Sequence, residues 1–354
     1  MAYTTIDKPS DFFETKLYVG NESTNAITGL DFQPDWVWLK NRDTSYYHGL
    51  YDSVRGTGNT KSLYSNASEA EGQNSGNMNL ASFNSDGFTL GATSSTNIIN
   101  KSSQNHVSWN WKAGTSFTND ASSTGIGSID SAGSVNTDAG FSIISYTGNA
   151  TDGATIAHGL GVTPDVIIAK SRASVEGWGF FHSSFSSQEY MFLNTTSPKG
   201  SASTVWNALP GSAVFTVGSN GSVNASGTMI AYCFAEKQGY SKFGSYTGNG
   251  NANGTFVYTG FKPAFTLIKR TDSATGGSWI LFDNKRGANV INPVDVVMAA
   301  SNNQAESDWG TTYDCDYLSN GFKWRYNGTG GYNNADGGTY IYMAFAENPF
   351  VTST

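Results

Sequence analysis

Three short segments with a proline and a lysine at a fixed spacing constrain the fold more than any other feature. They read PDWVWLK at residues 34–40, PDVIIAK at residues 164–170 and PAFTLIK at residues 263–269, and the lysine always follows the proline by six positions. Nearly every residue between these two points is apolar, on both faces of a pleated strand, which predicts a strand covered on both sides. Because proline cannot donate to a β-ladder, it should open the strand.

Longer stretches around these segments are also repeated. The run FSIISYTGNATDGATIAHGLGVTPDVIIAKSR at residues 141–172 returns as FGSYTGNGNANGTFVYTGFKPAFTLIKR at residues 243–270. Tyr-Asp-Ser-Val-Arg-Gly at residues 51–56 matches Phe-Asp-Asn-Lys-Arg-Gly at residues 282–287. The sequence therefore predicts a chain that contains three copies of one domain.

Within each copy, about seven or eight short runs of alternating apolar and polar residues are separated by turn signals such as Asn320-Gly321. This pattern predicts an all-β protein of three tandem antiparallel β-sandwich, jelly-roll-like repeats of about 100 residues each. The expected repeats are residues 1–114, 141–240 and 241–354. Residues 115–140 are rich in Ser, Gly, Thr and Asp and are expected to form a linker or an extended surface strap.

Composition narrows the class of protein. Charged residues make up only 14% of the chain, while 41 glycines and many Ser, Thr and Asn residues are available for turns. This composition is typical of a secreted or particle-surface β protein rather than a cytosolic metabolic enzyme. The net charge of −8 repels phosphate backbones, and we therefore expect no nucleic-acid binding.

Hydropathy predicts no membrane association. The opening MAYTTIDKPSDFF has neither the basic nor the apolar region of a signal peptide. No window approaches about 18 uninterrupted apolar residues, the length of a membrane-spanning helix.

The residue types that hold metals or form disulfides are few and scattered. The only cysteines, Cys233 and Cys315, lie in different copies and are expected to be buried thiols. The histidines lie on separate segments without metal-ligand spacing: His48, His106, His158 and His182. The sequence has no Gly-x-Ser-x-Gly elbow, and it nominates no carboxylate pair for glycoside hydrolysis. We therefore expect a non-enzymatic protein without catalytic residues, metal or cofactor.

Two pairs of charged residues in the repeated Asp-x-x-Arg-Gly pattern are the leading site candidates. They are Asp52 with Arg55 and Asp283 with Arg286. Such a pair could bind a sugar or a metal, but at a strand end it more often forms a local ion pair that stabilises a turn. We expect this structural role. The middle copy has His182 and Phe185 in the corresponding positions, so no catalytic group occurs in all three copies.

Aromatic residues in or beside polar segments are candidates for stacking on sugar rings. They are Trp178, Trp206, Trp309, Trp324 and Tyr332. The alternative for each is a place in a sandwich core, which also requires large aromatic side chains.

Several stretches carry a family resemblance. They are YTTIDKPSDFFETKLYVGN at residues 3–21, FQPDWVWLKNR at 32–42, SFNSDGFTLG at 82–91, WNWKAGTSFTNDAS at 109–122, GSIDSAGSVNTDAGFSIISYTG at 127–148, FAEKQGYSKFGSYTGNGNANGTFVYTGFKPA at 234–264 and GGTYIYMAFAENPF at 337–350. In these stretches the chain resembles a family of uncharacterised β-rich domains in virion structural proteins of tailed phages, mostly marine ones. The resemblance implies a location on the virion surface and no known catalytic residues.

The first interpretation is a non-enzymatic phage virion structural protein that decorates the capsid or forms part of a fibre or tail surface. Its partners would then be other virion proteins of the capsid or tail. The alternative is a carbohydrate-binding or depolymerising module that acts on host surface glycans. A homo-oligomer is left open, because three copies could imitate a trimer within one chain or the chain could itself trimerise.

Overall fold

Antiparallel β-strands make up almost all of the regular structure. The computed structural model describes residues 4–73, 75–94, 96–287, 292–308, 313–326 and 331–349. Within these ranges the helices are single turns: Pro9–Asp11 (η1), Asn59–Lys61 (η2), Ser75–Asn77 (η3), Ala121–Thr124 (α1) and Gly221–Asn224 (α2). The expected all-β class is confirmed. No helix in the described part of the chain is long and apolar enough to cross a membrane.

Three large sheets organise the chain into an N-terminal section (residues 4–114), a middle section (115–240) and a C-terminal section (241–349). The N-terminal sheet has the order β1-β7-β3-β4: Phe13–Val19, Asn105–Trp111, Trp36–Asn41 and Gly49–Asp52. The middle sheet has the order β15-β14-β13-β12-β17-β10-β9-β8: Gly200–Ser201, Glu189–Phe192, Trp178–His182, Val166–Ser171, Gly227–Phe234, Phe141–Gly148, Ser131–Asn136 and Thr115–Asn119. The C-terminal sheet has the order β18-β26-β20-β21-β22-β23: Ser241–Thr247, Thr339–Pro349, Phe261–Arg270, Ile280–Asp283, Val296–Ala299 and Ser307–Asp308.

Each section also has a small sheet. The strand orders are β2-β6-β5 (Asn25–Thr28, Gly87–Leu90, Leu80–Asn84), β11-β16 (Ala154–Ala157, Val214–Val217) and β19-β25-β24 (Phe256–Tyr258, Gly321–Trp324, Cys315–Leu318). The small sheets pack on their large sheets through apolar side chains. Ile27 and Phe88 share one buried cluster with Val37, and Val257 and Phe322 share another with Phe282. In the middle section, the Phe215 ring packs edge-on against the Tyr146 ring at 6.0 Å.

The strands that follow the repeated prolines are internal in all three large sheets. β3 lies between β7 and β4, β12 between β17 and β13, and β20 between β26 and β21. In β3, Val37 and Leu39 belong to the cluster beneath the small sheet, whereas Trp36 and Trp38 belong to a different core. This two-sided burial explains why the segments are apolar on both faces.

One detail of the proline expectation is wrong. Trp36 and Val166 begin their strands two residues after a proline, but β20 begins at Phe261, so Pro263 lies inside the strand. The register between β20 and β26 shifts on both sides of Pro263. Because the ladder is already interrupted at this bulge, the missing proline N–H is tolerated there.

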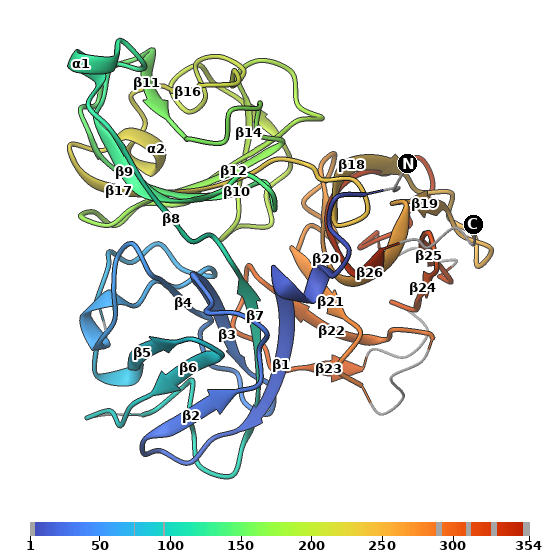
Figure 1. Cartoon of the computed structure of the whole chain (residues 1–354). Helices are drawn as coiled ribbons and strands as arrows, with labels where there is room; N and C mark the ends of the chain where they lie inside the picture. The colour runs from blue at the N-terminus through green and yellow to red at the C-terminus, as the bar shows by residue number, and fades with distance from the viewer. Residues whose placement is uncertain are drawn as a thin grey trace.

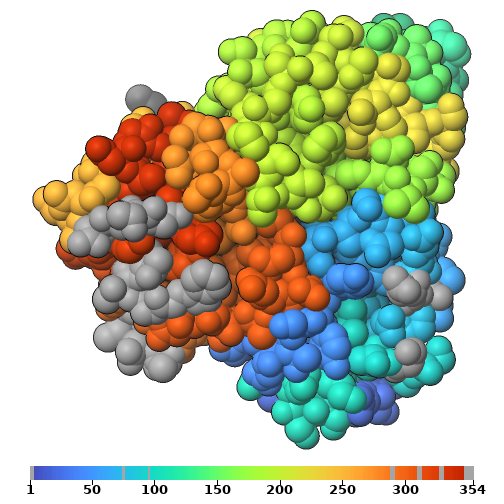
Figure 2. All heavy atoms as spheres, turned by 180° about the vertical axis from the view of Figure 1, so that it is seen from behind, coloured from blue at the N-terminus to red at the C-terminus, as the bar shows by residue number. Residues whose placement is uncertain are grey.

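The second face of each large sheet contributes to one central core. Trp36 stacks on Tyr232 of the middle section at 4.5 Å between ring centroids, and Trp111 meets Phe345 of the C-terminal section at 5.6 Å. The ring centroids of Phe234 in the middle section and Phe345 in the C-terminal section lie 5.9 Å apart, so these two sections are also in contact. Figures 1 and 2 show the three sections side by side in views from opposite sides. Truncating such a buried ring typically costs about 3–5 kcal/mol, so this core joins the sections firmly.

Residues 115–140, expected as a linker or strap, form regular structure. β8 and β9 extend the middle sheet, with β9 pairing antiparallel to β10 from Phe141 opposite Asn136 to Tyr146 opposite Ser131. Between them the Asp120 side chain accepts from the Ser123 N–H and caps α1. The strands that correspond to β10 in the other two large sheets are β1 and β18. Both are end strands, so only the middle sheet continues beyond this position.

Candidate functional site

The repeated Asp-x-x-Arg pattern forms two buried ion pairs. Arg55 Nε donates to Asp52 Oδ2 at 2.5 Å, and Arg286 Nε donates to Asp283 Oδ2 at 2.6 Å, with all four side chains fully buried. Each carboxylate also accepts from the backbone N–H of its own arginine and so closes the turn that follows β4 or β21. The geometry is that of a local ion pair that stabilises a turn.

Each aspartate also accepts a hydrogen bond from another section. Tyr232 Oη of β17 donates to Asp52 Oδ2 at 2.7 Å, and Trp109 Nε1 of β7 donates to Asp283 Oδ2 at 2.9 Å. These two donors occupy matching positions in their sheets. Trp109 pairs with Trp38 of β3 and Tyr232 pairs with Ile168 of β12, and these partners each lie four residues after the repeated proline. The ion pairs are therefore part of the contacts between sections.

The middle section has no aspartate at this position, and the residue that the C-terminal section presents there differs as well. The residue of β26 in the matching position is Met343, which pairs with Leu267 and has no hydrogen to donate. A buried carboxylate opposite methionine would lack that hydrogen bond, at a substantial cost in free energy. His182 stands there instead of an aspartate, and its Nε2 lies 3.3 Å from the Tyr342 carbonyl oxygen. Burial lowers the pKa of His182 to about 4, which keeps the ring neutral at pH 7.

The repeated lysines form a second set of contacts between sections. Lys40 Nζ donates to the Asn303 carbonyl at 3.3 Å, Lys170 Nζ to the Ser68 carbonyl at 3.2 Å and Lys269 Nζ to the Thr196 carbonyl at 3.3 Å. All three lysines are fully buried, and burial lowers their pKa values to about 7, 8 and 7 in that order. Each lysine thus binds a loop of the neighbouring section.

A ring N–H next to each lysine makes a third set. Trp178 Nε1 donates to the Tyr64 carbonyl at 2.8 Å, and Trp279 Nε1 donates to the Phe192 carbonyl at 3.0 Å. His48 takes this place in the N-terminal section. Its Nδ1 accepts from Trp38 Nε1 at 2.9 Å, which leaves the proton on Nε2, 3.1 Å from the Ala299 carbonyl. Burial holds the pKa of His48 well below its usual value and so favours this neutral form.

All three sets of contacts run in the same direction. In the N-terminal section the lysine, the ring N–H and the donor to the aspartate all reach the C-terminal section. The same three groups of the middle section reach the N-terminal section. The lysine and the tryptophan of the C-terminal section reach the middle section. The contacts therefore close a cycle. Sequence reasoning missed this cycle: the fixed proline–lysine spacing marked the three lysines but not the sections that they bind.

The structure corrects most of the proposed sugar-stacking residues. Trp178, Trp206 and Trp324 are 0%, 2% and 0% exposed, so no sugar ring can reach their faces. They pack in the sandwich and central cores. Trp309 lies outside the described residues. Tyr332 is half-buried and lines a pocket.

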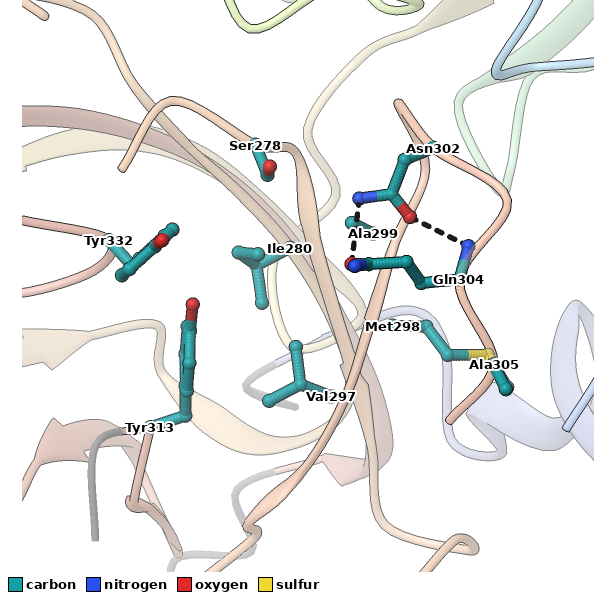
Figure 3. A pocket seen from close by; sticks show the side chains of 10 residues that line it. All are labelled: Ser278, Ile280, Val297, Met298, Ala299, Asn302, Gln304, Ala305, Tyr313 and Tyr332. Atoms are coloured by element: carbon teal, nitrogen blue, oxygen red, sulfur yellow. Dashed lines mark hydrogen bonds between the residues drawn. The ribbon is translucent and has the colours of Figure 1, made fainter. Parts of the chain in front are cut away.

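This pocket, of about 270 Å³, lies beside β21 and β22 of the C-terminal section (Figure 3). Ile280, Val297 and Ala299 provide an apolar surface, and Tyr332 packs against Tyr313 with ring centroids 5.1 Å apart. On the opposite side, Asn302 Nδ2 donates to Gln304 Oε1 at 3.2 Å, and the Gln304 N–H donates to Asn302 Oδ1 at 2.9 Å. Sequence reasoning identified only Tyr332 here, because the two amides belong to an ordinary polar loop.

Clusters with the composition of a metal site are not found in the described ranges, where no group of three or more His, Cys, Asp or Glu side chains could hold an ion. Both cysteines are buried as free thiols.

Comparison with known proteins gives one match. The model of a family described as a domain of unknown function (DUF7483) matches residues 8–349, and the chain therefore belongs to this family. No curated protein and no solved structure matches the chain.

Proposed function

We propose that this DUF7483 protein is a non-enzymatic structural protein of a phage virion, made of three tandem sandwich repeats that close into a ring with pseudo-threefold symmetry. The repeats correspond to residues 1–114, 141–240 and 241–354, and residues 115–140 form a strap on the middle repeat. The matching strand orders and the cyclic contacts support the threefold arrangement. The capsid or tail of the particle would supply its partners.

One observation supports a structural role most strongly. Several of the buried ionisable side chains, which in an enzyme would be candidates for catalysis, are engaged in contacts between sections. Asp52, Asp283 and Lys170 illustrate this use, because each bonds to a group in another section. Burying such groups costs free energy, and they can be retained because they specify a single arrangement of neighbouring elements.

The virion location rests on the sequence resemblance and on the composition of the chain. Its low charge content and its many glycines suit a durable surface scaffold. Immunogold electron microscopy with antibodies against the purified chain tests the location. We expect label on intact, purified particles of the phage that encodes it. Label confined to the lysate of infected cells would contradict the proposal.

Calorimetry tests the closed ring independently of the virion. Because the central core joins all three sections, the chain should unfold in one cooperative transition whose calorimetric and van't Hoff enthalpies agree. Three separable transitions would show that the repeats are independent domains.

A further inference from the structure

We propose that the pocket beside Tyr332 binds one neutral sugar residue of a glycan. This inference goes beyond the structural role and does not depend on it, because a virion scaffold with or without a sugar site would have the same interior contacts.

The pocket lies where the two sections differ: the C-terminal section has Ala299 where the middle section has Phe192, and it has Ile280 where the middle section has Gly179. In the middle section the pair Gly179–Phe192 lies next to the pair Phe180–Met191. In the C-terminal section the pair Ile280–Ala299 lies next to the pair Leu281–Met298 in the same way, so Ala299 corresponds to Phe192. The Phe192 ring of the middle section packs beside Gly177, where an added Cβ would meet Phe192 Cδ1 at 3.2 Å. In the C-terminal section Ser278 takes the place of Gly177 and Ala299 takes the place of Phe192, and both line the pocket.

The residues around this space match the chemistry of a sugar. Tyr332, which is half-buried, offers its ring to the C–H face of a pyranose, whereas the lining residues Ile280, Val297 and Tyr313 are only 2%, 6% and 1% exposed. Ser278, Asn302 and Gln304 offer a hydroxyl and two amides for its hydroxyl groups (Figure 3). The Asn302 amide donates to Gln304 Oε1 and accepts from the Gln304 backbone N–H, which leaves the Gln304 Nε2 hydrogens for a ligand.

Charge and size restrict the ligand further. None of the described residues that line the pocket is charged, and the chain carries a net charge of −8. An acidic sugar would lose hydration without gaining an ionic partner. A volume of about 270 Å³ lies just below the range of about 300–1,000 Å³ for sites of drug-sized ligands, which suits a single ring.

The test uses saturation-transfer difference NMR on the full chain. The probes are the methyl glycosides of glucose, galactose, mannose and N-acetylglucosamine, with glucuronic and galacturonic acid as charged comparators. We expect saturation transfer to at least one neutral glycoside and much less to either acid. If no neutral glycoside receives saturation, or if an acid binds as well, the proposal is wrong.

Substitutions locate the binding. Ala299→Phe fills the space with the residue that the middle section carries there, and it should weaken binding by about tenfold or more. Gln304→Ala removes an exposed amide with little effect on folding and should also weaken binding, so the proposal stays testable if Ala299→Phe is unstable. Tyr47→Ala, which alters an exposed tyrosine of the N-terminal section, is the control and should bind normally. Unchanged binding by both pocket variants would overturn the proposal.

Discussion

Trp109 donates its indole N–H to Asp283 Oδ2 at 2.9 Å across the boundary between the N-terminal and C-terminal sections. The same carboxylate accepts from Arg286 Nε and from the Arg286 backbone N–H within its own turn. Asp283 therefore links a local turn to a sheet that lies 174 residues away in sequence. Its removal should disturb both.

Asp283→Ala should lower the free energy of unfolding by about 3–5 kcal/mol, because the buried Arg286 guanidinium loses its main partner. Asp52→Ala should have a similar effect through Arg55 and Tyr232. Urea denaturation measures both. Glu22→Ala, which breaks the exposed ion pair with Lys101, is the control and should change stability far less. Aspartate variants as stable as this control would show that the buried pairs do not stabilise the fold.

His182 should make stability sensitive to acid. Burial lowers its folded-state pKa to about 4, below the unfolded value of about 6.5. Between these values the unfolded chain binds a proton that the folded chain does not, so stability falls as the pH falls from about 6.5 to about 4. The difference corresponds to about 3 kcal/mol over this window.

Unfolding free energies measured at intervals between pH 7 and pH 4 check this expectation. His182→Gln should reduce the pH dependence by about one proton, whereas His106 and His48, whose pKa values are also lowered by burial, retain theirs. An unchanged slope in the variant would mean that His182 has the same pKa in the folded and the unfolded chain.

The all-β class and the buried strands at Pro34, Pro164 and Pro263 were predictable because strand periodicity and turn residues are local signals. The Asp-x-x-Arg pairs were predictable for the same reason, since a carboxylate three residues before an arginine can close its own turn. The contacts between sections were not. They depend on which residue of a distant strand faces each turn, and no local pattern specifies this.

His182 illustrates this limit. In the sequence, His182 shows only that the middle copy lacks the Asp–Arg pair of the other two copies. In the structure it accompanies Met343, because a position without a hydrogen-bond donor does not suit a buried carboxylate. For Trp178 and Trp324 the sequence left both sugar stacking and a place in the core open, because adjacent residues of a strand face opposite sides and a polar neighbour says little about burial. The structure places both in the core.

Lys269 should produce a pH dependence in the alkaline range. Burial lowers its folded-state pKa to about 7, while the unfolded value is about 10.4. Between these values only the unfolded chain holds the proton, so the contribution of Lys269 to stability rises with pH from about 7 to about 10. Lys269→Met should flatten the rise in the free energy of unfolding between pH 7 and pH 9.5. Lys101→Met, which alters a partly exposed lysine, is the matched control and should leave the slope unchanged. If Lys269→Met also leaves it unchanged, its ammonium stays charged on the Thr196 and Arg270 carbonyls.

Gly133 in β9 should control whether the strap stays on the middle sheet. A Cβ atom at this position would lie 1.8 Å from the Ile143 carbonyl oxygen of β10, so even alanine requires β9 to move. Gly133→Ala should therefore destabilise the pairing of β9 with β10 by about 1–3 kcal/mol. Thr118→Ala, on the exposed side of the neighbouring strand β8, is the control and should have little effect. Hydrogen exchange measures the outcome, because amides of β9 should lose protection in Gly133→Ala while those of β17 keep it. Loss of β9 would also expose the edge of β10, a template for pairing with another chain, so light scattering should detect association of the variant. Full protection of β9 and a monodisperse variant would show that the strap tolerates the added atom and that its close approach does not determine the pairing.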